Sequence, residues 1–136
     1  MTGSLVVDTS ALMAVLLLED DAAVYAEALG LATELRMAAP TWLETAMVAT
    51  VRSGDDGYRE LSRFIDELHI EIVPVDRLLV EGAFEGWRRF GKGRHPAGLN
   101  YGDCFSYALA KLRNESLLFK GDDFPLTDIN PAVPGV

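Results

Sequence analysis

SLVVDTSALMAVLLL, at residues 4–18, holds a short apolar run rich in β-branched residues, then an aspartate, then a longer apolar run. The run at residues 4–7 predicts a buried strand that ends at Asp8. Residues 11–18 predict a strongly apolar helix. A strand that passes directly into a helix is the repeating step of α/β folds, so this segment indicates the fold class.

The rest of the chain repeats this alternation. Further strands are predicted over residues 34–39, 70–75 and 116–120, and helices over residues 20–31, 41–52, 58–68, 76–90 and 100–114. Loops are expected at residues 53–57 and, rich in glycine, at residues 91–98. The pattern predicts an α/β fold with a central, mainly parallel sheet flanked by helices. In such sheets the binding crevice lies at the carboxyl ends of the strands.

Length and composition predict one domain over residues 1–136, with an irregular tail from about residue 126. The chain is 49% hydrophobic and carries a net charge of −9, which excludes a disordered protein and a generally basic nucleic-acid-binding surface. A local basic patch, or a metal at an acidic site, remains compatible with that charge. A single cysteine, no basic N-terminal region and no apolar run of membrane length lead us to expect a cytoplasmic protein that contacts no membrane.

Acidic residues follow three of the predicted strands. Asp8 ends the first strand, Glu44 lies shortly after the second, and Asp122 and Asp123 follow the last, while Asp103 falls in the first turn of a helix. Four carboxylates at one rim would repel one another by about 4 kcal/mol per pair at 4 Å and an effective dielectric of 20. A hard divalent cation such as magnesium removes that repulsion, bridges to phosphate and activates water for attack on a phosphodiester.

Each acid also has a purely structural interpretation. Asp8 would cap the helix that follows it, and Thr41 with Glu44 fits the S/T-x-x-E capping box. Asn100 with Asp103 is a similar cap, and the last acidic pair would stand in a turn. Taken together, however, these interpretations give no reason for the acids to gather at one edge of one sheet.

Four acid-bearing stretches can be compared with a known family: VVDTSA at 6–11, WLETA at 42–46, LNYGDCFSYA at 99–108 and LLFKGDDF at 117–124. The last two are the specific ones, and DTSA alone would be a weak match. The four stretches resemble the PIN domain and, more narrowly, the VapC toxins of bacterial toxin–antitoxin pairs. The resemblance runs from about residue 4 to residue 129. It implies a three-layer PIN-like fold and a magnesium-dependent endoribonuclease, with manganese as an alternative ion, that leaves a 5′-phosphate and a 3′-hydroxyl.

The resemblance also implies roles for the acids. The family's conserved acids match Asp8, Glu44 and Asp103, with the fourth at Asp122 or, alternatively, at Asp123. Asp8 and Asp103 would be the principal magnesium ligands. Glu44 and the fourth acid would act through metal-bound waters or a second metal and orient the nucleophile.

Further expectations come from the same resemblance. The hydroxyl that follows the family's first aspartate matches Thr9 or Ser10, and Gly121 stands where many PIN domains carry an acid, which keeps the choice of fourth acid open. Members of the family are typically homodimers. A small VapB-type antitoxin inhibits them by inserting a C-terminal segment over the active site.

Four of the chain's 12 basic residues gather just before the predicted Asp103 helix. We predict that they bind RNA phosphates, with Trp87 and Phe90 available for packing or base stacking. The competing interpretation is an ordinary solvated helix end, where cations suit the helix dipole. The four residues are Arg88, Arg89, Lys92 and Arg94.

Two other functions fit parts of the sequence. A catalytically silent PIN-like module that binds an antitoxin or RNA would have no reason to keep four like charges together. A haloacid-type phosphatase needs a second aspartate two residues after the first, where this chain has Ser10. Cys104 follows Asp103 but has no histidine placed beside it by the sequence, and we interpret it as a buried hydrophobic residue.

Overall fold

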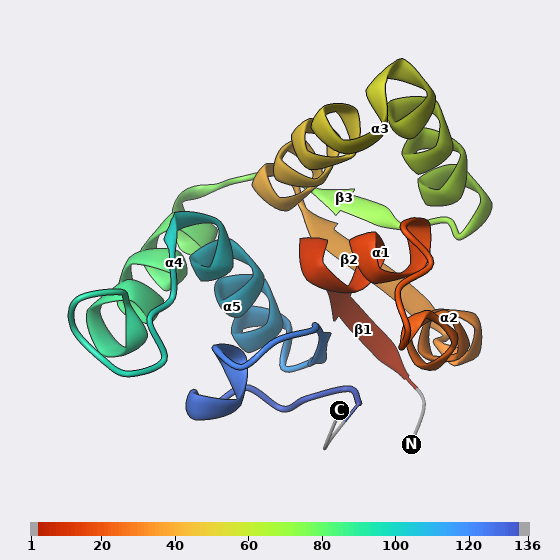
Figure 1. The fold of residues 1–136 in the computed structure, drawn as a ribbon. Helices are drawn as coiled ribbons and strands as arrows, with labels where there is room; N and C mark the ends of the chain where they lie inside the picture. The colour runs from red at the N-terminus through yellow and green to blue at the C-terminus, as the bar shows by residue number, and fades with distance from the viewer. Residues whose placement is uncertain (1–2, 134–136) are drawn as a thin grey trace.

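Four parallel strands form the central sheet in the order β3-β2-β1-β4 (Figure 1). The computed structural model describes residues 3–133. Val6 of β1 lies opposite Arg36 of β2 and Leu117 of β4, and every pairing is parallel, as predicted. The strands are β1 (Ser4–Val7), β2 (Glu34–Ala38), β3 (Glu71–Val73) and β4 (Ser116–Leu118).

Helices cover both faces of the sheet, which gives the expected three-layer α/β architecture (Figure 1). Alternate residues of β1 point to opposite faces: Leu5 and Val7 join the core under α1, α2 and α3, whereas Val6 joins the core under α4 and α5. Both cores are apolar, as a parallel sheet that is buried on two sides requires. The helices are α1 (Thr9–Leu16), α2 (Ala22–Leu31), α3 (Ala39–Glu67), α4 (Arg77–Phe90) and α5 (Tyr101–Arg113).

Helix α3 differs from the prediction at two points. The predicted break between two helices is present, because two helices meet at a kink at Gly54, but the five-residue loop at 53–57 is wrong: only Gly54 is non-helical. Its φ of 65° is open to glycine without strain. The helix also begins at Ala39, so Thr41 lies inside it and does not cap it. The capping-box interpretation of Glu44 is therefore wrong as well, because the N-cap position is Ala38 and has no side-chain hydrogen bond.

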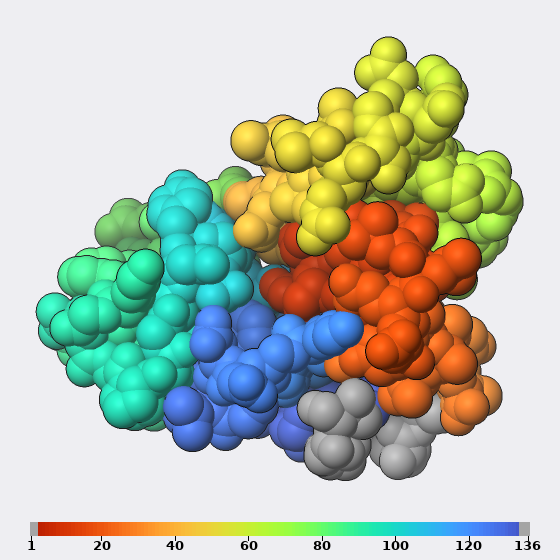
Figure 2. All heavy atoms as spheres, in the orientation of Figure 1, coloured from red at the N-terminus to blue at the C-terminus, as the bar shows by residue number. Residues whose placement is uncertain are grey.

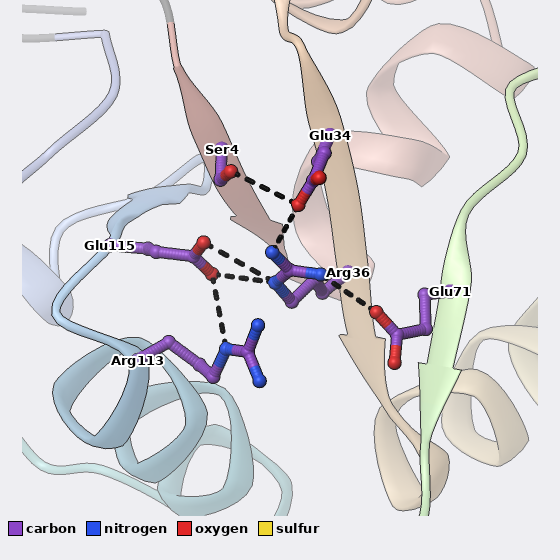
Figure 3. Close-up of polar contacts among 6 residues, drawn as sticks. All are labelled: Ser4, Glu34, Arg36, Glu71, Arg113 and Glu115. Carbon is purple, nitrogen blue, oxygen red and sulfur yellow. Dashed lines mark hydrogen bonds and ion pairs between the residues drawn. The ribbon is translucent and has the colours of Figure 1, made fainter.

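A buried arginine ties three strands together on the α5 side of the sheet (Figure 3). Arg36 of β2 is 8% exposed, and it donates to Glu71 of β3 at 2.7 Å and to Glu115, just before β4, at 3.0 Å. It also pairs with Glu34 on its own strand, which accepts a second hydrogen bond from Ser4 of β1. These carboxylates raise the pKa of Arg36, so the guanidinium stays charged although it is buried.

The C-terminal segment is mostly irregular, as predicted, with one short 3-10 helix at Phe124–Leu126. It is fastened to the sheet where the Leu117 N–H donates to the Asn130 carbonyl, and to α5 where the Tyr107 hydroxyl donates to Asp128 at 2.8 Å. No helix in residues 3–133 is long and apolar enough to cross a membrane.

Candidate active site

Asp8 lies at the carboxyl end of β1, where the strand turns into α1. It is 5% exposed, and it caps α1 by accepting the Ser10 N–H at 3.1 Å. The Ser10 hydroxyl also donates to the same oxygen at 2.7 Å while it accepts the Lys120 N–H at 2.9 Å. The other carboxylate oxygen accepts the Ser106 hydroxyl at 2.6 Å. The Asp8 side chain thus caps α1 and belongs to the site at the same time. Hydrogen bonds from Ser10 and Ser106 fix the direction of its two carboxylate oxygens.

Glu44 comes from the second turn of α3 and reaches the same place. Its carboxylate accepts a hydrogen bond from the Thr9 hydroxyl at 3.2 Å, and Thr9 also contacts the hydroxyl of Thr45 at 2.8 Å. Burial and the negative charge of Asp8 raise the pKa of Glu44, while the Thr9 hydroxyl lowers it. The first and second predicted acids therefore share one electrostatic environment.

Asp103 is placed by the start of α5. Its side chain accepts the Asn100 N–H at 3.1 Å and Asn100 accepts the Asp103 N–H at 2.8 Å, so the predicted capping box is present. Glu44 packs directly against this turn: a β-carbon added at Gly102 would lie 2.7 Å from Glu44 Oε1. Glycine at this position allows the α3 carboxylate to approach the α5 backbone.

The electrostatics of Asp103 show that the acids converge. Its pKa is raised to about 7, first by burial and then by the charges of Asp8, Asp123 and Glu44, against the lowering effect of the Asn100 N–H. Asp123 lies in the exposed turn after β4, next to the equally exposed Asp122. In Figure 2, α1, the start of α3, α5 and this turn meet around a hollow on the face shown.

This donor set suits a hard divalent cation. All of its side-chain donors are oxygens, and such a cation would offset both the burial and the neighbouring negative charges that raise the pKa of Asp103. In the part of the chain that the structure describes, no three His, Cys, Asp or Glu side chains are grouped so as to hold an ion among themselves. Magnesium is commonly bound by only one or two carboxylates together with water, so the residues fit that ion.

Two parts of the site were not predicted from the sequence. Ser106 is 1% exposed and holds Asp8 from α5, 98 positions away in the chain. Thr41 and Thr45 add hydroxyls beneath the acids, and Thr45 donates to the Thr41 carbonyl at 2.7 Å. The signal in the sequence is the concentration of Ser and Thr at positions that would otherwise be apolar on α3 and α5.

The predicted RNA-binding residues are engaged in local contacts. Arg88 pairs with Glu85 at 3.2 Å, and Arg89 pairs with Asp128 at 3.3 Å. Arg94 lies over the ring of Trp87, with 4.7 Å between its guanidinium carbon and the ring centroid. Lys92 borders an apolar groove between α4 and α5. The run therefore serves partly to fold the α4–α5 connection.

Comparison with known proteins identifies the family. Residues 5–130 match the PIN domain model. Ribonuclease VapC of Mycolicibacterium smegmatis is 47% identical over 125 residues, which cover 92% of this chain and 97% of that protein. Ribonuclease VapC30 of Mycobacterium tuberculosis is 48% identical over 126 residues, covering 92% and 95%.

A solved structure has the same fold. VapC20 of Mycobacterium tuberculosis, described as a sarcin-ricin loop cleaving toxin, superposes with a TM-score of 0.73 and 16% identity over 93% of this chain and 99% of that one. The family model covers all of the residues that build the site, and the matches to the two VapC relatives cover 97% and 95% of those proteins. The chain therefore belongs to the PIN-domain family and, within it, to the VapC ribonucleases, a family of toxins from toxin–antitoxin systems.

Proposed function

We propose that this protein is a magnesium-dependent endoribonuclease toxin that hydrolyses RNA phosphodiester bonds to 5′-phosphate and 3′-hydroxyl ends. The observation that carries the proposal is the cluster of acids at the carboxyl end of β1: Asp8 caps α1 there, Thr9 donates to Glu44 at 3.2 Å, and Glu44 reaches the Gly102 backbone beside Asp103. A fold keeps such an unfavourable cluster where a function requires it. Manganese is the alternative ion.

Each acid has a proposed role. Asp8 and Asp103 bind the metal ion, and Glu44 positions the attacking water from the α3 side. Asp123 is our choice for the fourth acid, since its charge acts on Asp103. Ser10 and Thr9 support the site through their hydroxyls: Ser10 holds Asp8, and Thr9 holds Glu44. A bound magnesium ion would supply the positive charge that phosphodiester hydrolysis needs.

Cleavage of end-labelled total RNA by the purified, antitoxin-free protein tests this function. Reactions with magnesium, with manganese and with EDTA are compared with the Asp8→Asn variant. We expect discrete cuts that require metal and are lost in the variant, with products that a 5′-monophosphate-dependent exonuclease degrades. Metal-independent cutting, or cutting by the variant, would contradict the assignment. A folded protein that cuts nothing would favour the silent binding module.

We also propose that the protein works in the cytoplasm as a homodimer controlled by a VapB-type antitoxin. The family supplies this expectation, and exposed apolar side chains on α3 are compatible with it, such as Leu43 and Met47. Sedimentation of the purified chain, alone and with the product of an adjacent antitoxin gene, tests both partners. A monomer that no antitoxin inhibits would contradict them.

A further inference from the structure

Few of the described basic side chains of this protein are free of an acidic partner. Within residues 3–133, most of the basic side chains already pair with acids, and the net charge of the chain is −9. Electrostatic attraction to RNA is correspondingly weak, so the substrate needs another source of binding free energy. The paired cations are Arg36, Arg59, Arg63, Arg77, Arg88, Arg89, Lys111, Arg113 and Lys120.

Tyr101 offers that source beside the acids. It is the first residue of α5, two positions before Asp103, and its side chain is 82% exposed. The next residue is Gly102, whose backbone Glu44 approaches. The ring of Tyr101 is left in water, whereas the ring of Phe105, 5.2 Å away between centroids, is buried.

Two apolar grooves meet at Tyr101. Tyr101 lines two apolar grooves: one of about 790 Å³ shared with Glu44 of the acid cluster, and one of about 560 Å³ between α4 and α5. Lys92 lies on the wall of the second groove, and no ion pair involves it in the described part of the chain. Trp87 also lines this groove, with Arg94 over its ring, so the groove beside Tyr101 has both aromatic and basic residues in its wall.

We propose that Tyr101 is a base-stacking residue of the nuclease: an unstacked nucleobase next to the scissile phosphate lies on its ring, and Lys92 meets a phosphate of the same strand. This inference rests on the proposed function. Every base has a π-face, so such a platform binds single strands with little dependence on sequence. It requires the nucleotide to leave its own stack, so the site favours unpaired RNA over duplex.

The test measures binding of a fluorescent, mixed-sequence single strand of about 12 nucleotides and of its duplex. All variants carry Asp8→Asn to prevent cleavage. Tyr101→Phe keeps the ring, Tyr101→Leu keeps only apolar surface, and Tyr101→Ala removes both. Val51→Ala is the matched control, because Val51 is 86% exposed on α3 and lines none of these grooves.

We expect the Ala and Leu variants to bind the single strand about tenfold more weakly than the parent chain, at every salt concentration. The Phe variant and the Val51 control should stay within about twofold, and duplex binding should not change. Stacking releases no counterions, so the slope of log affinity against log salt should be unaltered. Thermal melting of each variant checks that the substitution at this exposed position leaves the protein folded.

Three results would overturn the inference. Undiminished binding by Tyr101→Ala, or full binding by Tyr101→Leu, would show that the ring is not a stacking platform. A change in sedimentation that accounts for the loss would assign Tyr101 to a contact with a second copy. In parallel, chains that retain Asp8 are assayed for cleavage. If the parent chain and its Val51→Ala variant cut RNA, the nuclease assignment stands whatever the outcome for Tyr101. If neither of these two chains cuts RNA, the proposed function itself fails.

Discussion

Replacing Asp103 by asparagine should stabilise the metal-free protein while it abolishes cleavage. The rise of the Asp103 pKa from 3.8 to about 7 corresponds to about 4 kcal/mol of unfavourable free energy for the ionised side chain, at about 1.4 kcal/mol per pKa unit. Because Asp103 is only partly buried, solvent screening reduces the expected gain to about 2–3 kcal/mol. Asparagine keeps an oxygen that accepts the Asn100 N–H, so the cap of α5 survives.

The gain should depend on pH with a definite sign. Below about pH 4 the carboxyl is protonated in the folded and the unfolded chain, and the substitution should change little. Between about pH 4 and 7 the unfolded chain loses the proton and the folded chain keeps it, so the stability of the parent falls as the pH rises. Above pH 7 the difference between parent and variant should be full and constant.

Urea unfolding in EDTA at pH 4, 6 and 8 measures this difference. Asp55→Asn is the matched control, because Asp55 is exposed on α3 and its removal should leave stability within about 0.5 kcal/mol. Magnesium should raise the unfolding midpoint of the parent chain and not that of the Asp103 variant. A variant that is no more stable than its parent at pH 8, or equally more stable at pH 4 and pH 8, would refute the reasoning.

Three further substitutions separate folding from function. Gly102→Ala would place a β-carbon 2.7 Å from Glu44 Oε1 and push that flexible side chain aside, so cleavage should fall about tenfold or more while melting stays unchanged; parallel rate and melting measurements decide. Ser106→Ala removes a 2.6 Å hydrogen bond from buried Asp8, which should cost about 1–3 kcal/mol in urea unfolding and weaken manganese binding by calorimetry; intact metal affinity would deny it a positioning role. Arg89→Ala should lower stability by no more than about 1 kcal/mol and leave the salt dependence of RNA binding unaltered, and a shallower slope would return Arg89 to the phosphate contacts.

The arrangement of the acids could be predicted because strand ends are visible in a sequence. Residues 5–7 are continuously apolar, so the end of the strand at Asp8 is marked by the first charge, and parallel strands bring their carboxyl ends to one edge. The cap at Asn100 and Asp103 is equally local and was confirmed. Glu44 was expected at this edge, although the helix that carries it begins earlier than predicted.

Features that depend on distant partners could not be predicted. The Ser106 hydroxyl is informative only once α5 is packed beside β1, and the pairing of Arg89 depends on Asp128, 39 positions later. The kink at Gly54 shows a different limit: the local composition of residues 53–57 favours a loop of several residues, but the two helices meet with only Gly54 in a non-helical conformation.

The ion pairs of Arg36 also determine how the strands align. Parallel strands of three to five residues exchange few hydrogen bonds, and their apolar side chains would accept several alignments almost equally well. A slip of β2 by one residue would turn Arg36 toward the α1–α3 core, away from Glu71 and Glu115, and leave a buried charge without partners. That slip would also shift the start of α3, and Glu44 with it. One arginine at the centre of the sheet thus selects the single alignment in which the acids at its edge meet.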